Sequence, residues 1–242
     1  MTFNHEEFEK EKSAFLLQQN HDEALQANAF DFVAKADKHR YEYQWTWMGM
    51  PIIKMPEDII LIQQIIYATK PDYIIETGIA WGGSVVYYAS LLQLLGKGEI
   101  IAIDTILPKK NIDKIMAYSF SSRIHLLEGS SIDVTIFEKV KALIKPNTKV
   151  MVILGNHTHE HVYNELNLYS SLVSSGQYII VEDTVLEHIP QQVHRQRPWG
   201  SGNNPYTAVK QFLLENKNFS NDNKYNKICL ISCNKGGYIV RA

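Results

Sequence analysis

The stretch YIIETGIAWGGS, residues 73–84, decides the fold of this chain. It consists of a short apolar run that ends in an acid, a turn that holds Gly78, Gly82 and Gly83, and the start of a helical pattern. A buried strand that leads through a glycine-rich turn into a helix N-terminus is the usual way in which an open α/β sheet receives a nucleotide-like ligand. The stretch therefore predicts an α/β sheet with a ligand site at the carboxyl end of its first central strand.

Strand-like and helical patterns alternate around this stretch. We expect further buried strands at 99–104, 124–128, 149–154 and 177–182, and helices at 56–69, 84–95, 111–121, 132–144, 159–174 and 206–216. The alternation predicts a doubly wound, mainly parallel, Rossmann-like sheet with helices on both faces. Two β-rich runs near the end of the chain, ICLIS and YIVRA, surround a turn signal. We interpret them as a terminal β-hairpin that completes a seven-stranded sheet.

The first 50 residues differ in pattern from the rest. Their apolar residues are scattered at roughly helical spacing among many charges, which predicts two or three short helices. We interpret residues 1–50 as a helical appendage on a domain of residues 51–242; a lid or an oligomer contact is the alternative. The run YEYQWTWMGMP, residues 41–51, indicates a shaped loop that could wall a ligand pocket, although aromatic residues also fill cores.

The composition argues against several classes of partner. The formal net charge is −2 and the isoelectric point is near 6.5, so there is no electrostatic basis for binding nucleic acid or an anionic membrane. The charged N-terminus argues against a secretory signal, and no apolar window reaches the length of a bilayer. The two cysteines, Cys229 and Cys233, suit a reducing compartment, so we expect a cytoplasmic protein.

Polar side chains stand at the ends of all five predicted parallel strands. In an open parallel sheet, ligands bind beyond the carboxyl ends of the strands. These ends carry Glu76, Asp104, Ser130 with Ser131, Asn156 with His157, and Glu182 with Asp183. The residues are far apart along the chain, but a parallel sheet would bring them to one edge. Their pattern therefore predicts a single site.

The turn after the first central strand differs from a dinucleotide-binding turn. Its spacing is not G-x-G-x-x-G, and no basic residue nearby could meet a phosphate. Glu76 suits a cationic or hydroxyl-bearing ligand, and Asp104 stands where an acid accepts the two ribose hydroxyls of an adenosine. Gly78, Gly82 and Gly83 would let the backbone approach an amino-acid moiety closely. S-adenosylmethionine meets these demands; the alternative is that the glycines only permit tight strand–helix packing.

The adjacent acids Glu182 and Asp183 are a second signal. Neighbouring carboxylates are costly unless they are solvated, paired or bound to a cation, and Mg²⁺ suits oxygen ligands. His157, at the adjoining strand end, could act as a general base on a substrate hydroxyl. In the run HTHEH, His157 and His161 share a helix face and could bind zinc, whereas His159 and His161 could simply be polar residues at a helix N-terminus.

The loop RPWGSGNNP, residues 197–205, combines rigid Pro, aromatic and amide groups. Loops of this kind often contribute to binding, so it is a candidate lid on the substrate side. A purely structural loop is the alternative.

At this point the residues resemble the cephalosporin hydroxylase family. The resemblance is carried, over about residues 45–242, by PDYIIETGIAWGGS, IIAID, NHTHEHVYNELNLYSSLV, VEDT and RPWGSGNNPYTAVKQFL. It implies the class I S-adenosylmethionine-dependent methyltransferase fold, O-methylation or methoxylation of sugars and antibiotics, dependence on Mg²⁺, and oligomers.

The resemblance also implies roles for particular positions. Glu76, Gly78 and Ser84 would touch the methionine part of S-adenosylmethionine, Asp104 the ribose and Ser131 the adenine side. Glu182 and Asp183 would be metal ligands. The family usually has an acid as a further metal ligand just before the histidine cluster, but this chain reads Leu154-Gly155-Asn156-His157. Asn156 would then offer a neutral oxygen to the metal.

The functional expectation is O-methyl transfer from S-adenosylmethionine to a hydroxyl of a small molecule, such as a sugar or a polyhydroxylated natural product. His157 would deprotonate the acceptor hydroxyl, and the Glu182/Asp183 site would orient it, so catalysis would be largely positioning. We expect copies of the chain to associate. A scaffold that binds S-adenosylmethionine without catalysis is an alternative. A metal-dependent hydroxylase is a third hypothesis, against which stands the lack of two histidines and a carboxylate at suitable spacing.

Overall fold

The structure, a computed structural model, describes residues 3–242. Its α-helices are α1 (His5–His21), α2 (Glu23–Asp37), α3 (Pro56–Thr69), α4 (Gly83–Leu94), α5 (Lys109–Met116), α6 (Val134–Leu143), α7 (His159–Tyr169), α8 (Pro205–Glu215) and α9 (Asn223–Ile228). Its strands are β1 (Trp45–Trp47), β2 (Met50–Ile52), β3 (Tyr73–Thr77), β4 (Glu99–Asp104), β5 (Ile124–Glu128), β6 (Val150–Leu154), β7 (Tyr178–Val181), β8 (Phe219–Asn221) and β9 (Tyr238–Arg241). Within the described range no helix is long and apolar enough to cross a membrane.

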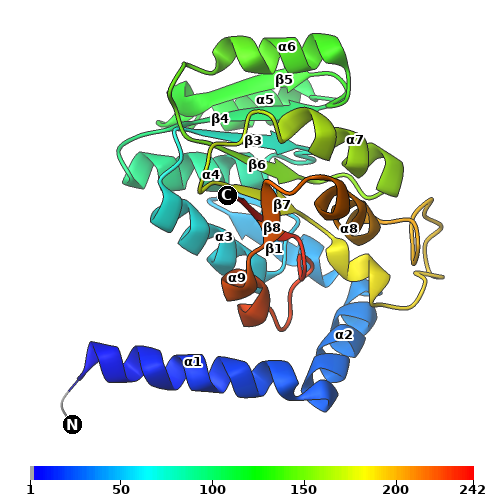
Figure 1. Cartoon of the computed structure of the whole chain (residues 1–242). Helices are drawn as coiled ribbons and strands as arrows, with labels where there is room; N and C mark the ends of the chain where they lie inside the picture. Colours follow the sequence, from blue (N-terminus) through cyan, green and yellow to red (C-terminus); the bar gives the residue numbers. More distant parts are fainter. Residues whose placement is uncertain (1–2) are drawn as a thin grey trace.

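A seven-stranded sheet forms the centre of the molecule (Figure 1). Its strand order is β5-β4-β3-β6-β7-β9-β8; the first five strands are parallel, and β9 is antiparallel to both β7 and β8. The predicted doubly wound, mainly parallel sheet is therefore confirmed. The chain runs from β3 outward to β4 and β5 and then returns to place β6 on the other side of β3. Such a reversal of strand order opens a crevice at the carboxyl ends of the two central strands.

Successive residues of the central strands bury opposite faces of the sheet, as the alternation of a strand requires. Ile74 belongs to an apolar cluster with residues of α3 and α4, whereas its neighbour Ile75 belongs to a second cluster with residues of α6, α7 and α8. Both side chains are completely buried. The two clusters fix the sheet between two helical layers and hold its carboxyl edge rigidly.

The second cluster provides a test of stability. Phe212 of α8 is 1% exposed and its ring lies 5.3 Å from the ring of Phe219, centre to centre. Phe212→Ala should lower the free energy of unfolding by about 3–5 kcal/mol, because a large cavity replaces a packed ring. Leu214→Ala on the same helix is the matched control; its side chain is 73% exposed, so the change should stay within about 0.5 kcal/mol. Urea unfolding of both variants measures the difference, and equal losses would contradict this packing.

The prediction of a strand at ICLIS is wrong. Residues 229–232 are irregular, and the strand that pairs with β9 is β8, with α9 between them. The backbone N–H groups of Leu230 and Ile231 donate to the Glu57 carboxylate at the start of α3, at 2.6 and 2.9 Å. Because these donors are used there, the segment cannot form a ladder. Cys229 and Cys233 are both buried and free, as a reducing compartment allows.

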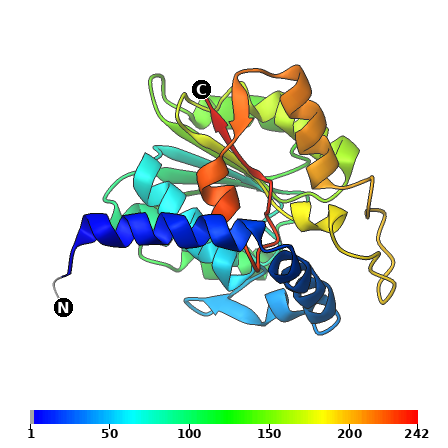
Figure 2. The ribbon, with the colours of Figure 1, turned by 60° about the horizontal axis from the view of Figure 1, so that its bottom comes forward.

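The N-terminal region contains two long helices instead of two or three short ones. Figures 1 and 2 show α1 projecting along the outside of the molecule, and no residue of α1 is buried. Its end is held by Gln19 and Asn20, whose side-chain amides donate to carbonyl oxygens of α9. In α2, by contrast, Val33 packs into an apolar cluster with Val185 and Leu186. The second helix therefore packs against the segment that follows β7.

The aromatic run at 41–51 is more regular than the predicted loop. It forms a short 3₁₀ helix, η1 (Tyr41–Gln44), and then the antiparallel pair β1–β2, which turns at Met48 and Gly49. Both turn residues have positive φ angles, 48° and 86°, as a two-residue hairpin turn requires. The pair packs against α4, and η1 lies at the edge of a cavity described below.

Candidate active site

The carboxyl ends of β4, β3, β6 and β7 lie next to one another in the sheet. They bring together Asp104, Glu76, the Gly155–His157 segment and Glu182 with Asp183, as predicted from the strand pattern. Two cavities open at this edge. One is small and lies beside the glycine turn, and the other is larger and lies beyond β6 and β7.

The small cavity surrounds an unpaired carboxyl oxygen. Glu76 is 2% exposed, and its Oε2 atom is buried without a hydrogen-bond partner in the structure. Burial raises the pKa of Glu76 to about 8, although the nearby Lys54 ammonium opposes this shift. The cavity holds about 40 Å³ and is also lined by Gly78 and Ser84. An orphaned carboxyl in a space little larger than a water molecule fits the ammonium end of an amino acid.

The three positions of the turn are glycine for different physical reasons. A Cβ on Gly78 would lie 3.3 Å from the carbonyl oxygen of Gly155, so the two strand ends approach closely here. A Cβ on Gly83 would overlap the backbone of Pro51, and one on Gly82 would overlap the Ile115 side chain. Tight packing thus accounts for Gly82, whereas Gly83 both packs tightly and lines the small cavity. Gly78 also lines both cavities.

Asp104 lies where a ribose-binding acid would be needed. It is half-exposed, its Oδ2 atom accepts the Ala80 N–H at 3.0 Å, and its Oδ1 atom accepts the Ile106 N–H at 3.3 Å. The carboxylate is therefore held beside the glycine turn and remains open to solvent. Asp104 and Glu76 thus present two carboxyl groups along the same edge of the sheet.

Ser131 is less available than the resemblance implies. Its hydroxyl donates to Glu165 Oε1 at 2.6 Å and lies 2.9 Å from His161 Nε2, and the residue is 7% exposed. Its side chain is thus directed to α7. Ser130 is half-exposed, and neither serine lines either of the two cavities.

The larger cavity has a volume of about 290 Å³. It is walled by the end of α2, by η1, by the segments after β6 and β7, and by the loop near residues 192–199. The predicted roles of the aromatic run as a pocket wall and of Trp199 as part of a substrate-side loop agree with this lining. Trp199 stacks on the imidazole of His157 with ring centres 4.4 Å apart, and the Arg197 guanidinium lies 5.0 Å above the Trp199 ring.

His157 and Asp183 form an acid–base pair in this cavity. The Nε2 atom of His157 lies 3.0 Å from Asp183 Oδ2. Burial disfavours the charged form of each group, but their attraction outweighs it: the pKa of His157 is raised and the pKa of Asp183 is lowered. A carboxylate that holds one imidazole nitrogen leaves the other, Nδ1, to take a proton from a ligand.

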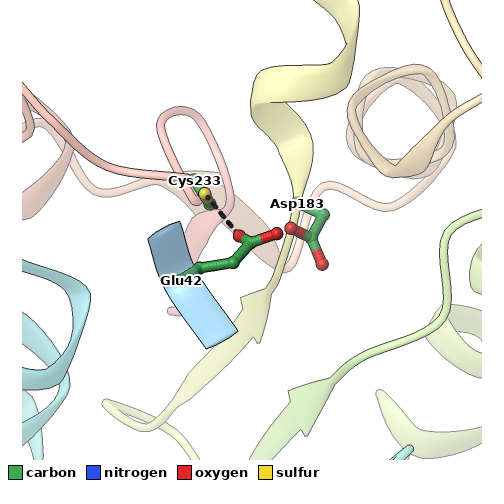
Figure 3. A group of neighbouring side chains, drawn as sticks. All are labelled: Glu42, Asp183 and Cys233. Atoms are coloured by element: carbon green, nitrogen blue, oxygen red, sulfur yellow. Dashed lines mark hydrogen bonds between the residues drawn. The ribbon is translucent and has the colours of Figure 1, made fainter. Parts of the chain in front are cut away.

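Two residues that the sequence pattern did not indicate, Glu42 and Cys233, lie beside Asp183 in this cavity. Figure 3 shows the Glu42 carboxyl between the Cys233 thiol, which donates to it at 3.5 Å, and Asp183. One carboxylate oxygen of Glu42, one of Asp183 and the sulfur of Cys233 lie within 4.8 Å of one another. Burial, and then the charge of Asp183, raise the pKa of Glu42 to about 7, so that near neutral pH it can donate a hydrogen bond as well as accept one.

Asn156 and Gly155 do not present a metal ligand. The Asn156 Oδ1 atom accepts the backbone N–H groups of His157, at 2.8 Å, and Thr158, at 3.2 Å, so its amide is turned back to its own loop. Gly155 has no side chain, and a Cβ there would lie 2.7 Å from the carbonyl oxygen of Thr77. Position 155 therefore resists any larger residue.

Glu182 and Asp183 are engaged with other partners. Glu182 forms an ion pair with Lys54, whose side chain is 6% exposed. Asp183 is held by His157. Together with the turned amide of Asn156, these contacts mean that each of the three expected oxygen ligands already has another partner, and in this arrangement the residues present do not fit Mg²⁺.

The zinc hypothesis for the histidine cluster also fails on geometry. His157 faces Asp183, whereas His161 faces Ser131 and Glu165. The two imidazoles therefore do not face a common position at which a zinc ion could bind. His159 lies 2.8 Å from the Thr207 hydroxyl and 3.1 Å from Gln211 of α8. His159 thus joins α7 to α8, as a structural polar residue near a helix start.

The loop of residues 197–205 divides into two parts. Asn203 and Asn204 are structural, since Asn203 accepts the His159 N–H at 3.0 Å and Asn204 caps α8 by a capping box. Arg197 and Trp199 instead line the larger cavity. The structural interpretation is therefore correct for Asn203 and Asn204, whereas a lid role for Arg197 and Trp199 stays a prediction.

Comparisons with known proteins identify the family of this chain. The family model "Rhamnosyl O-methyltransferase/CmcI" matches residues 39–242. Rhamnosyl O-methyltransferase of Mycobacterium tuberculosis is 29% identical over 183 residues, which are 74% of this chain and 69% of that protein. The Mycobacterium leprae enzyme of the same name is 26% identical over 173 residues, covering 70% of this chain and 71% of its own.

Solved structures share the fold at lower identity. A CmcI structure described as containing Mg and S-adenosylmethionine has a TM-score of 0.58 and 19% identity, covering 83% of this chain and 77% of its own. An O-methyltransferase from Bacillus cereus in complex with S-adenosylhomocysteine has a TM-score of 0.52 and 12% identity, covering 81% and 82%. These likenesses confirm the Rossmann-like methyltransferase fold.

Proposed function

Because the chain belongs to the rhamnosyl O-methyltransferase/CmcI family, we propose that it transfers the methyl group of S-adenosylmethionine to a hydroxyl of a sugar or another polyhydroxylated small molecule. The observation that carries the proposal is the junction of the two cavities. Both are lined by Ile53, Gly78, Ala80 and Glu182. A donor whose amino-acid end enters the small cavity would direct its methyl group toward the larger one, where His157 lies.

The residues of this chain would act mainly by positioning. When bound, S-adenosylmethionine supplies an electrophilic methyl group on its sulfonium. Glu76 would hold the ammonium of its methionine part and Asp104 its ribose. As the acceptor oxygen forms its bond to the methyl carbon, the electron pair of the broken carbon–sulfur bond stays on sulfur. His157 takes the acceptor proton, and Asp183 stabilises the imidazolium that results.

The larger cavity suits an acceptor with several hydroxyls. Carboxyl groups of Asp37, Glu42 and Asp183 line it and can accept hydrogen bonds, and the flat surface of Trp199 can pack against a sugar ring. The mycobacterial relatives named as rhamnosyl O-methyltransferases support a sugar acceptor.

A direct assay tests this proposal. The purified full chain is incubated with methyl-labelled S-adenosylmethionine and a panel of monosaccharides, rhamnosides and polyphenols. We expect an acceptor that gains one labelled methyl group for each S-adenosylhomocysteine formed. If the protein binds S-adenosylmethionine but methylates no hydroxylated acceptor, the scaffold alternative replaces the enzyme.

The protonation of Glu76 predicts a pH dependence of donor binding. With a pKa of about 8, free Glu76 is largely protonated at pH 6, and binding of a cationic ligand must release that proton. The affinity for S-adenosylmethionine should therefore increase as the pH rises from 6 to 7.5, by up to about tenfold per pH unit. Calorimetry in buffers of different ionisation enthalpy measures both the affinity and the released proton. Glu76→Gln should bind weakly and lose this dependence; an unchanged slope in that variant would contradict the assignment.

We also propose that copies of the chain associate through α1. Its exposed Phe8 and Phe15 lie one heptad apart, at 59% and 66% exposure, and so can share one face of the helix. Light scattering of the full chain and of a Phe8→Ser, Phe15→Ser variant would distinguish an oligomer from a monomer.

A further inference from the structure

Lys54 occupies an unusual position at the edge of the sheet. It follows β2 in a mainly apolar segment, is 7% exposed, and forms an ion pair with Glu182 between the two cavities. Burial disfavours its charge, but Glu182 and Glu76 reverse this effect and raise its pKa. Its ammonium group also lies 5.9 Å from the centre of the Tyr88 ring. A buried lysine is thus held charged among acids.

This charge compensates Glu182, one of the residues at which a divalent ion was expected, and the neighbouring acid Glu76. Glu76 is buried and Glu182 is partly buried, and the charge of Lys54 favours the anionic form of both carboxyls. The other expected ligands, Asn156 and Asp183, are satisfied by the backbone and by His157. Among the expected metal ligands, Glu182 is therefore the one acid that still needs a cation, and Lys54 of the same chain supplies it.

We infer that the Lys54 ammonium stands in place of a divalent cation in this chain, and that methyl transfer here is independent of metal. The second part of the inference, that methyl transfer is independent of metal, rests on the proposed function. Lys54 lines the small cavity but not the larger one, so it is a positioning residue that acts through Glu182. Lys54 would hold the Glu182 side chain in one position at the junction of the two cavities, between the bound donor and the bound acceptor.

The first experiment measures metal binding and requires no acceptor. Mn²⁺, which can replace Mg²⁺ at oxygen sites, is titrated into the full chain and followed by electron paramagnetic resonance. We expect no stoichiometric binding to the wild-type protein at submillimolar Mn²⁺. Lys54→Ala should gain a Mn²⁺ site, because Glu182 and Glu76 both lose their cation. Lys54→Arg should keep the wild-type behaviour, as should Lys139→Ala, which changes an exposed lysine of α6.

The second experiment measures turnover after treatment with a chelator. Wild-type turnover should not change when divalent ions are removed or when millimolar Mg²⁺ is restored. Lys54→Ala should lose at least about tenfold in kcat, and Lys54→Arg should recover most of it. Circular dichroism of each variant reports folding separately.

The outcomes separate this inference from the proposed function. One tight Mn²⁺ ion per wild-type chain, or turnover that disappears with chelator and returns with Mg²⁺, would overturn the inference while leaving methyl transfer intact. If no acceptor is methylated, the proposed function fails, and the Mn²⁺ titration alone decides whether Lys54 holds the place of the ion.

Discussion

Replacing His157 with alanine should lower kcat by about 10²–10⁴-fold, the usual contribution of a positioned general base. In the proposed mechanism a neutral imidazole takes the acceptor proton, and His157, paired with Asp183, lines the larger cavity. Because His157 does not line the small cavity, the affinity for S-adenosylmethionine should change little. Since the pKa of His157 is raised, wild-type kcat should also fall as the pH drops through that pKa, above 6.5.

The matched control is His159→Ala, two residues further along. His159 contacts α8 through Thr207 and Gln211 and does not line either cavity. Its removal should affect stability by about 1 kcal/mol and leave kcat nearly unchanged. Initial rates at saturating acceptor, together with calorimetric binding of the donor, measure both effects. Equal kcat for His157→Ala and the wild-type protein would remove His157 from the mechanism without touching the donor site.

Asp104→Asn should weaken binding of S-adenosylmethionine by roughly 30- to 1000-fold. The variant keeps an oxygen that can accept the Ala80 or Ile106 N–H, so the turn should stay in place. What it loses is the charge on two hydrogen bonds from the ribose hydroxyls, each of which contributes about 1.5–3 kcal/mol when the acceptor is ionised. The expected loss of affinity is therefore large although the change in shape is small.

The control for this variant is Asp113→Asn. Asp113 lies on α5, and its side chain pairs with Lys109 at the exposed surface. The change should leave donor affinity as it is in the wild-type protein. A full titration of S-adenosylmethionine into each variant gives the comparison, and wild-type affinity in Asp104→Asn would place the ribose elsewhere.

The positions of the parallel strands could be predicted closely because each is an unbroken apolar run with turn-forming or polar residues at both ends. The runs at 99–104 and 124–128 match β4 and β5 to the residue. The grouping of Glu76, Asp104, His157 and Asp183 followed from the same pattern, because parallel strands deliver their carboxyl ends to one edge. Helix ends were less accurate: α7 stops at Tyr169, before the predicted end at 174.

Other parts depended on contacts that a sequence pattern does not encode. The run ICLIS has strand-like composition, but Glu57, far away in sequence, takes its backbone donors. Lys54 is a single lysine in an apolar segment and gives no local signal of its ion pair with Glu182. Asn156 has a side chain that could bind a metal or its own backbone equally well, and only the geometry of the loop decides between them.

The most direct test of the account is a calorimetric titration of S-adenosylmethionine into the wild-type protein and Glu76→Gln at pH 7.5. The site at the end of β3 requires that the donor bind once per chain and that the buried Glu76 carboxyl receive its ammonium. We predict saturable one-to-one binding by the wild-type protein, with proton release, and binding weakened at least about tenfold in Glu76→Gln. No saturable heat with the wild-type protein, or equal affinity in the two proteins, would contradict the account.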